Sequence, residues 1–297
     1  MIVTAANLEA IRVGFKSNFN TGLGVAVSQA ALIASEVPSS GPKERYGWLG
    51  NLPGVREWIG DRVIQNLAEA EYEIINRDWE LTLGVDRNHI QDDNLGIYAP
   101  LFTEMGRSTG AHKDELVFGL LKTGFTVKCF DAQPYFSTDH PVKDKNGKET
   151  KYANTDGGAG TPWFLMVTGR ALKPLIYQNR KPWTFVARDN PDHQNVFSKK
   201  EFQYGADARG AAGFGFPQMC WGSKQTLNAA NYAKARAAIM AMTGDYGRPL
   251  GLVPDTLVVP PGLEADALKL LNAEYGTGGE TNPWKGTAKP LVVPWLA

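Results

Sequence analysis

Apolar and polar residues alternate along one segment in the first third of the chain. Within residues 71–87, every second position from Trp79 to Val85 is apolar, and the positions between them are polar or glycine. This period of two predicts a strand with one dry face. A two-stranded arm buries too little apolar surface to be stable alone in water, so we expect a second copy of the chain to cover an extended loop over residues 58–90.

The spacing of apolar residues becomes helical in the next segment. Residues 91–124 predict a long helix, and Asp92 or Asp93 is placed to accept hydrogen bonds from the free amides of its first turn. Interior glycine is unfavourable by about 1 kcal/mol, and interior proline by about 3 kcal/mol, relative to alanine. We therefore expect a bent or segmented rod. The interrupting residues are Pro100, Gly106 and Gly110.

Two units precede the extended loop. Residues 1–44 begin with a helical pattern and continue with small residues, which have too little apolar bulk to fold alone, so we expect an arm that lies on another surface. Residues 45–57 are rich in glycine, proline and aromatic residues and predict a compact loop-and-turn unit. The apolar residues of the helical pattern are Leu8, Ile11, Phe15 and Phe19, and those expected to pack under the loop are Trp48, Leu52 and Trp58.

The rest of the chain divides into three units. Residues 125–162 predict an irregular connection with an exposed hairpin tip at Asn146 and Gly147. Residues 163–224 predict short strands that are broken by Arg, Gly and Pro. Residues 225–297 alternate helix, strand, helix and strand, and therefore predict an α/β unit of their own.

The composition excludes several classes of protein. The chain of 297 residues is 43% hydrophobic and 10% aromatic, which excludes disorder of the whole chain. Its 31 basic and 31 acidic residues cancel, so the net charge gives no argument for a dedicated nucleic-acid binder. The sequence has no run of about 18 apolar residues that could span a membrane and no secretory signal pattern, so we expect a cytosolic product.

Candidate metal and cofactor ligands are sparse. Cys129 and Cys220 are isolated in the sequence, and we interpret them as small buried side chains. None of the histidines lies three to five residues from another histidine or a cysteine, so the sequence offers no zinc template. The glycine clusters match neither dinucleotide-binding nor phosphate-binding loops, and residues 91–94 lack the glycine and distal glutamate of a calcium hand. We expect no cofactor and no metal.

Two groups of residues leave alternatives open. Asp131, Asp139 and His140 could orient a general base, because a carboxylate beside an imidazole can do so, but we favour a turn that closes before Pro141. Aromatic and basic residues interleaved over 163–188 could stack on single-stranded nucleic acid, but we favour a sheet core with basic residues at the turns. We therefore expect no enzyme, and a hydrolase that uses the Asp131, Asp139 and His140 group is a minor alternative.

Several long strings of sequence together carry a resemblance to a known family. The strings are RYGWLGNLPGVREWIGDR, WELTLGVDRNHIQDDNLGIYAPLFTEMGRS and FDAQPYFSTDHP, supported by ALKPLIYQNRKPWTFVARD, FQYGADARGAAGFGFPQM and PDTLVVPPGLEADALKLLN. In this order they cover almost the full chain, which resembles the major head subunit of Mu-like bacteriophages. The resemblance implies an α+β fold of the Hong Kong 97 type, with an N-terminal arm, an extended β-hairpin loop, a peripheral domain with a long spine helix, and an α/β axial domain.

The resemblance also assigns the predicted units to the parts of that fold. It implies that residues 1–44 are the arm, 58–90 the extended loop and 91–124 the spine helix of the peripheral domain. The strands of 163–224 would belong to the peripheral domain, and residues 225–297 to the axial domain.

The function that the resemblance implies is that of a major capsid protein. Hexamers and pentamers of the chain would close into an icosahedral head around double-stranded DNA, which the subunit would contact non-specifically. Because only the arm precedes Tyr46, we expect the scaffolding protein to be separate. The other implied partners are a portal protein and a cement or decoration protein, and the implied location is the virion, with the host cytoplasm during assembly. A non-viral nanocompartment shell of the same fold is the alternative.

One departure from the founding example of that fold can be read directly. There, a lysine on the extended loop forms a covalent cross-link, whereas this chain has no lysine between Lys43 and Lys113. We therefore expect a shell held by non-covalent contacts. On the alternating strand, we expect charged residues to form ion pairs between subunits and apolar residues to supply buried contact. The charged residues are Glu80, Asp86 and Arg87, and the apolar residues are Trp79, Leu81 and Leu83.

Overall fold

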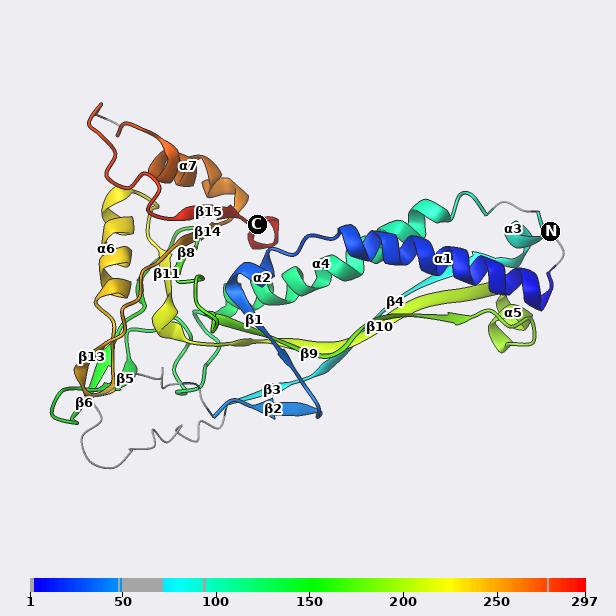
Figure 1. Ribbon diagram of the computed structural model, residues 1–297, viewed down its shortest axis with the longest axis horizontal. Helices are drawn as coiled ribbons and strands as arrows, with labels where there is room; N and C mark the ends of the chain where they lie inside the picture. Colours follow the sequence, from blue (N-terminus) through cyan, green and yellow to red (C-terminus); the bar gives the residue numbers. More distant parts are fainter. Residues whose placement is uncertain (1–2, 48, 50–71, 93–94, 277) are drawn as a thin grey trace.

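Two helices lie lengthwise along one face of a long, twisted sheet and form an elongated rod that ends in a compact α/β unit (Figure 1). The computed structural model describes residues 3–47, 49, 72–92, 95–276 and 278–297. The N-terminus lies at the far tip of the rod, and the C-terminus lies where the rod meets the compact unit (Figure 1). The expected α+β class is confirmed.

The rod's two helices are α1 (Ala5–Val25) and α4 (Ala99–Thr123). The side chain of Thr4 accepts a hydrogen bond from the amide of Asn7 and so caps the first turn of α1. The helical pattern expected in the arm is confirmed, and its apolar residues are buried in this chain rather than left for another surface. These buried residues are Leu8, Ile11, Phe15 and Phe19.

Glycines allow α1 and α4 to approach each other closely. A Cβ atom on Gly22 would lie 1.8 Å from the carbonyl oxygen of Thr103, and one on Gly106 would lie 2.0 Å from the carbonyl oxygen of Phe19. No other residue type fits against a neighbouring backbone at these distances. The prediction of a segmented rod is therefore wrong, because α4 is one continuous helix. Gly106 lies where α4 contacts α1 and lets the two helices approach each other.

The start of α4 also differs from the prediction. Pro100 lies in the first turn of α4, where backbone amides have no acceptor within the helix. Proline lacks an amide hydrogen, so at this position it costs the helix no hydrogen bond. Asp92 does not cap α4, because it directly follows the short helix α3 (Arg87–Gln91). Asp93 lies outside the described residues.

The rod's sheet has the strand order β1-β9-β10-β4. The long strands β9 (Leu175–Arg188) and β10 (Glu201–Phe214) are antiparallel, and β4 (Arg77–Asp86) is antiparallel to β10. The short strand β1 (Ala34–Pro38) is parallel to β9. Since β4 pairs with β10, the prediction that it forms one strand of a two-stranded arm is wrong.

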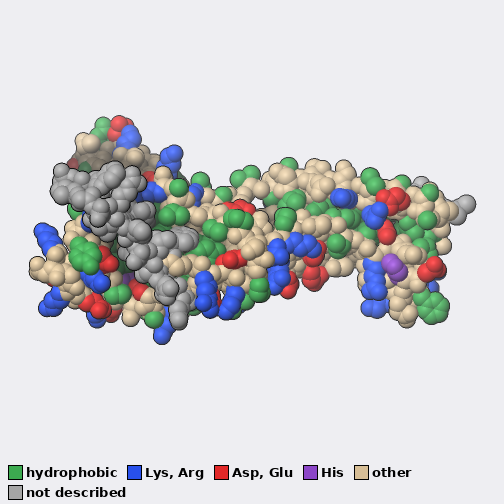
Figure 2. All heavy atoms as spheres, turned by 60° about the horizontal axis from the view of Figure 1, so that its bottom comes forward, with side chains coloured by type: hydrophobic (Ala, Val, Ile, Leu, Met, Phe, Trp, Pro, Cys, Tyr) green, Lys and Arg blue, Asp and Glu red, His purple; other side chains and the backbone are tan. Residues whose placement is uncertain are grey.

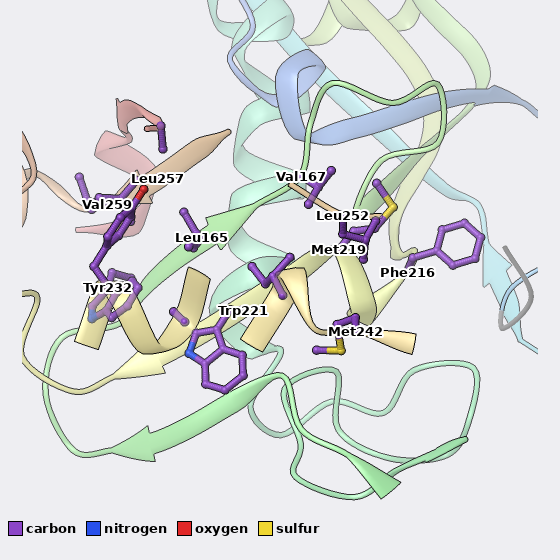
Figure 3. Close-up of a cluster of buried hydrophobic side chains, with 14 of the residues drawn as sticks. Leu165, Val167, Phe216, Met219, Trp221, Tyr232, Met242, Leu252, Leu257 and Val259 are labelled. Carbon is purple, nitrogen blue, oxygen red and sulfur yellow. The ribbon is translucent and has the colours of Figure 1, made fainter. Parts of the chain in front are cut away.

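The compact unit contains a second sheet with the order β15-β14-β8-β11-β7. Residues of β8 (Trp163–Met166) and β14 (Thr256–Val259) alternate between two hydrophobic clusters, so this sheet is covered on both faces. The helices α6 (Ala229–Met240) and α7 (Glu264–Asn272) contribute to one cluster, and the C-terminal half of α4 contributes to the other. Figure 3 shows the first cluster, with labelled side chains that include Leu165, Val167, Tyr232, Leu257 and Val259.

Two sequence predictions for this part have different outcomes. The helix–strand alternation over 225–297 is confirmed, with β15 (Lys289–Val292) parallel to β14. The strands predicted within 163–224 are divided between two sheets, because β8 and β11 (Cys220–Lys224) belong to the compact unit while β9 and β10 belong to the rod, and their assignment to a peripheral domain stays a prediction.

The connection between α4 and β8 contains the predicted hairpin. Strands β5 (His140–Lys143) and β6 (Glu149–Tyr152) are antiparallel, and Gly147 at their turn has φ +79°. The remaining elements are α2 (Ala30–Ile33), β2 (Lys43–Arg45), β3 (Glu73–Ile75), β7 (Thr155–Gly158), α5 (Gln194–Lys199), β12 (Thr243–Gly244), β13 (Arg248–Pro249) and the 3₁₀ turns Pro217–Met219, Asp245–Gly247, Pro261–Leu263 and Pro294–Leu296.

The loop-and-turn unit predicted over 45–57 is described only in part. Tyr46 and Leu49 are buried in a cluster of the compact unit. Trp48, Leu52 and Trp58 lie outside the described residues. Among the described helices, none has both the length and the hydropathy that crossing a membrane requires.

Candidate assembly surfaces

The strand that carries the predicted contact residues is an edge strand. β4 pairs with β10 on one side, and no strand of the described part of the chain pairs with its other side. Exposure alternates along β4, with apolar side chains on the less exposed face. The period-two prediction for this strand is confirmed.

The apolar face of β4 packs within the chain. Leu81 and Leu83 contact the buried cluster that α1 and α4 form over the sheet. Trp79 donates a hydrogen bond from Nε1 to the carbonyl oxygen of Gly210 at 3.1 Å, and its ring lies edge-on to His112 with centroids 4.4 Å apart. The expectation that a second copy covers this face is therefore wrong, because the chain's own helices cover it.

The opposite face of the rod's sheet carries charged side chains of both signs. Figure 2, in which this side is turned toward the viewer, shows basic and acidic side chains interspersed along the rod. Glu80 of β4 lies directly opposite Asp207 of β10, and Asp207 forms an ion pair with Lys181 of β9. Like charges at directly opposite positions are unfavourable. Among the described residues, the hydrogen bond that Glu80 receives comes from the Thr82 hydroxyl at 2.7 Å, and no basic side chain forms an ion pair with it.

The other two charged residues of the predicted set lie where β4 ends. Asp86 caps α3, because its carboxylate accepts a hydrogen bond from the amide of Asn88 at 2.6 Å. Arg87 donates its backbone amide to the carbonyl oxygen of Lys200 at 2.8 Å, while its side-chain Nε is buried and has no partner among the described groups. Asp86 therefore has a structural role within the chain, and Arg87 keeps a donor without an acceptor.

The group considered for hydrolysis is only partly brought together. His140 is fully buried, and its Nδ1 lies 2.6 Å from Oδ2 of Asp131. Burial opposes ionisation of Asp131, but its hydrogen bonds, foremost that from His140, outweigh burial and lower its pKa. Asp139 points away and forms an ion pair with Lys151 at 2.8 Å. An imidazole with 0% exposure offers no face to a substrate, so the arrangement does not support hydrolysis.

Sequence reasoning missed one member of this group. Cys129 donates a hydrogen bond from Sγ to Oδ1 of Asp131 at 3.1 Å. Burial, followed by the nearby Asp131 carboxylate, raises the pKa of this thiol. The spacing of 11 residues between Cys129 and His140 matches no short ligand motif, and only the fold of the connection brings them together.

Solved structures of phage shells share this arrangement of rod and compact unit. The chain matches a chain in the procapsid of bacteriophage JBD30 with a TM-score of 0.89 and 41% sequence identity, covering 99% of this chain and 100% of that one. It also matches, with a TM-score of 0.78 and 33% identity over 93% of both chains, a JBD30 capsid decorated with minor capsid protein trimers. The fold is therefore that of a phage capsid subunit of the Hong Kong 97 type.

Sequence comparison identifies the family. The family model for the Mu-like prophage major head subunit gpT matches residues 8–296, and the chain belongs to this family. The chain is 43% identical to the major capsid protein of Escherichia phage Mu over 100% of both proteins. It is 42% identical to the Mu-like prophage FluMu major head subunit of Haemophilus influenzae, over 92% of this chain and 91% of that protein.

Membership in this family decides between the function classes left open by the sequence. The chain is a major capsid protein of the tailed-phage type and a structural component of the virion capsid, and it is not an enzyme.

Proposed function

We propose that this chain assembles as hexamers and pentamers that close into an icosahedral head around double-stranded DNA. The observation that carries the proposal is the likeness over almost the whole chain to a subunit of the JBD30 procapsid, at a TM-score of 0.89. A subunit with this fold along its full length has the elements from which that shell is built. The zero net charge is compatible with a non-specific relation to DNA, since a strongly basic inner wall would bind the packaged polyanion.

The outer face of the rod's sheet is the surface proposed to meet neighbouring subunits. Glu80 supports this role, because it is an exposed carboxylate that faces a like charge within its own chain and has no basic partner among the described residues. Arg87, at the start of α3, is kept in the proposed set, but its unpartnered Nε is buried and does not itself support the role. Since the apolar side of β4 is covered by α1 and α4, Trp79, Leu81 and Leu83 would position this face rather than supply most of the contact area.

The contacts between subunits are proposed to be non-covalent. Residues 44–112 contain no lysine, so this region has no amine from which an isopeptide bond could start. Exposed ion pairs contribute about 0–1 kcal/mol each, and their effect on a shell comes from repetition over many copies. Particles boiled in detergent should therefore run as a single band at 32.4 kDa on a denaturing gel. A ladder of covalent multimers would contradict this part of the proposal.

The proposed partners are a separate scaffolding protein, a portal protein and a decoration protein. The decorated JBD30 capsid supports the last of these, because a relative of 33% identity carries minor capsid protein trimers. Co-expression with and without a candidate scaffold tests the first partner. Closed heads of uniform size from this chain alone would show that no separate scaffold is needed.

Negative-stain microscopy and size-exclusion chromatography of the purified chain test the central proposal. We expect hollow polyhedral particles, or pentamers and hexamers before closure. A protein that stays monomeric at high concentration, in the presence of the scaffold candidate as well, would contradict it. Closed particles filled with an enzyme instead of DNA would indicate a nanocompartment.

A further inference from the structure

A buried group of potential metal ligands lies between the end of α4 and the β5–β6 hairpin. The sulfur of Cys129, a carboxylate oxygen of Asp131 and a ring nitrogen of His140 all lie within 4.8 Å of one another. Cys129 is 5% exposed and His140 is 0% exposed. Buried polar groups of this kind are held by specific partners, so the partners of each atom are informative.

The hydrogen bonds around His140 fix the state of one ring nitrogen. Its Nε2 lies 3.2 Å from two oxygens, the carbonyl of Tyr135 and Oδ1 of Asn154. The orientation of Asn154 is set independently, because its Oδ1 accepts from the amide of Ser137 and its Nδ2 donates to the carbonyls of Tyr135 and Pro217. Both neighbours of Nε2 are therefore acceptors, and Nε2 carries a hydrogen.

The second ring nitrogen then faces a negative charge. With the hydrogen on Nε2, neutral His140 directs the lone pair of Nδ1 at the Asp131 carboxylate, whose Oδ2 is 2.6 Å away. At 2.6 Å these two atoms form a hydrogen bond. A metal ion that takes the place of the bridging hydrogen would hold the two atoms further apart, because its bonds to nitrogen and oxygen are each about 2.0–2.2 Å long. In metal-bound histidines, the ring nitrogen that does not contact the metal commonly donates a hydrogen bond to a carbonyl, and the other ring nitrogen coordinates the metal.

Tyr152 supplies an independent observation. Its ring stacks on His140 with centroids 4.9 Å apart and an interplanar angle of 21°, and its hydroxyl is buried with no hydrogen-bond partner among the described groups. A buried hydroxyl without a partner, on a ring that stacks on His140, is available to a further ligand.

We propose that Cys129, Asp131 and His140 bind one zinc-type divalent cation, with the Tyr152 hydroxyl or a water molecule as the fourth ligand. A thiolate, an imidazole and a carboxylate form a donor set typical of Zn²⁺. On binding, the thiol of Cys129 and the hydrogen bond between Nδ1 of His140 and Asp131 each release a proton to solvent, while Nε2 keeps its hydrogen. The cation would link the connection after α4 to the β5–β6 hairpin and stabilise this part of the compact unit.

Metal binding by the full, untagged chain tests the proposal directly. The chain is stripped with a chelator, exposed to a small excess of Zn²⁺, dialysed and analysed for metal content. We expect one zinc per chain and a higher unfolding temperature than that of the stripped protein. Replacement by Co²⁺ should give the near-ultraviolet charge-transfer absorption that a cobalt–thiolate bond produces.

Variants separate this site from unspecific binding. Cys129→Ala and Cys129→Ser should lower zinc affinity at least tenfold and abolish the cobalt–thiolate absorption. Cys220→Ala is the matched control, because Cys220 is equally buried but lies outside the group, and it should bind as the unsubstituted chain does. A stripped chain that takes up no zinc, or one whose binding survives both Cys129 substitutions, would overturn the proposal, and the hydrogen bonds of the group would then be its only role. If the variants fail to fold, the cobalt spectrum of the unsubstituted chain decides alone.

Discussion

The two sheets of the molecule are covered differently, and under the role proposed for the rod's outer face this difference separates folding from assembly. In the compact unit, Phe164 of β8 and Val258 of β14 contact one cluster, while Leu165 and Leu257 contact another, so neither face of the sheet reaches solvent there. In the rod, α1 and α4 cover one face only, and the other face is a row of charged residues. Substitutions in the compact strands should therefore act on folding, and substitutions on the outer face of the rod on contacts between subunits.

The largest effect is expected in the compact sheet. Phe164→Ala removes a fully buried ring that packs on Phe136 with centroids 5.3 Å apart. We expect a loss of about 3–5 kcal/mol in the free energy of unfolding, because the cavity collapses only in part. Val186→Ala is the control on the rod's outer face, where Val186 is 46% exposed, and it should change stability by less than about 0.5 kcal/mol. Denaturant unfolding of the unassembled subunit measures both, and similar losses would show that the two faces do not differ.

A smaller effect is expected at the contact of the rod's helices. Gly106→Ala places a Cβ atom 2.0 Å from the carbonyl oxygen of Phe19, so α1 and α4 must separate, at a loss of about 1–3 kcal/mol. Gly119→Ala is the matched control, because it makes the same change in the same helix with no atom within 4 Å of the new Cβ. It should stabilise the subunit by about 0.5–1 kcal/mol through helix propensity. Changes of the same sign in both variants would rule out the close contact.

Asp255 gives a pH-dependent test in the compact unit. Burial opposes its ionisation, but hydrogen bonds from Thr168, Thr256 and Gly169 outweigh burial and lower its pKa. A lowered pKa in the folded state contributes stability above the unfolded value near pH 4, and this contribution is lost as the pH falls through the folded pKa. Asp255→Asn should therefore lose about 1 kcal/mol at pH 7, and the difference from the unsubstituted chain should shrink below about pH 4.

The control for this test is a surface aspartate. Asp192 is exposed, and its carboxylate accepts no hydrogen bond within the part of the chain that the structure describes. Asp192→Asn should leave the dependence of the unfolding midpoint on pH unchanged. A constant difference between the Asp255→Asn variant and the unsubstituted chain from pH 7 to pH 3 would contradict the role given to the ionised carboxylate.

The elements that the sequence predicted well are those whose pattern is local. The alternation along β4 and the apolar spacing of α1 each follow from the period of one element on a one-sided core. Pairing partners are not local: β4 pairs with β10, more than 100 residues later, and nothing in residues 71–87 indicates this. Gly106 illustrates the same limit, because a helix-breaking residue and a residue required for helix contact look identical in sequence.

The candidate sites were predictable to a similar extent. Glu80 could be assigned to the solvent side of its strand from the period of two, but its like-charged neighbour Asp207 follows only from the register. The group of Cys129, Asp131 and His140 could not be found from ligand spacing, since the irregular connection folds back on itself to bring the three together. Contacts between segments that are far apart in the sequence leave no periodic pattern, so only the structure shows them.

The smallest effect on folding, and the sharpest test of the comparison, is expected from Glu80→Lys. Within the chain, the substituted side chain faces Asp207, so an unfavourable pair becomes a favourable one, and the subunit should gain up to about 0.5 kcal/mol in stability. Between subunits, the same charge reversal replaces an attraction of about 0–1 kcal/mol per contact with a repulsion, and assembly should weaken.

Glu149→Lys makes the same change in net charge on the exposed β6 strand of the compact unit and should leave assembly unchanged. Unfolding of the subunit measures the change in its stability, and the protein concentration at half-assembly measures the change in association. Both are measured at low and high salt. If Glu80→Lys assembles as readily as the unsubstituted chain at low salt, Glu80 does not face a neighbouring subunit, and the outer face of the rod has a different role.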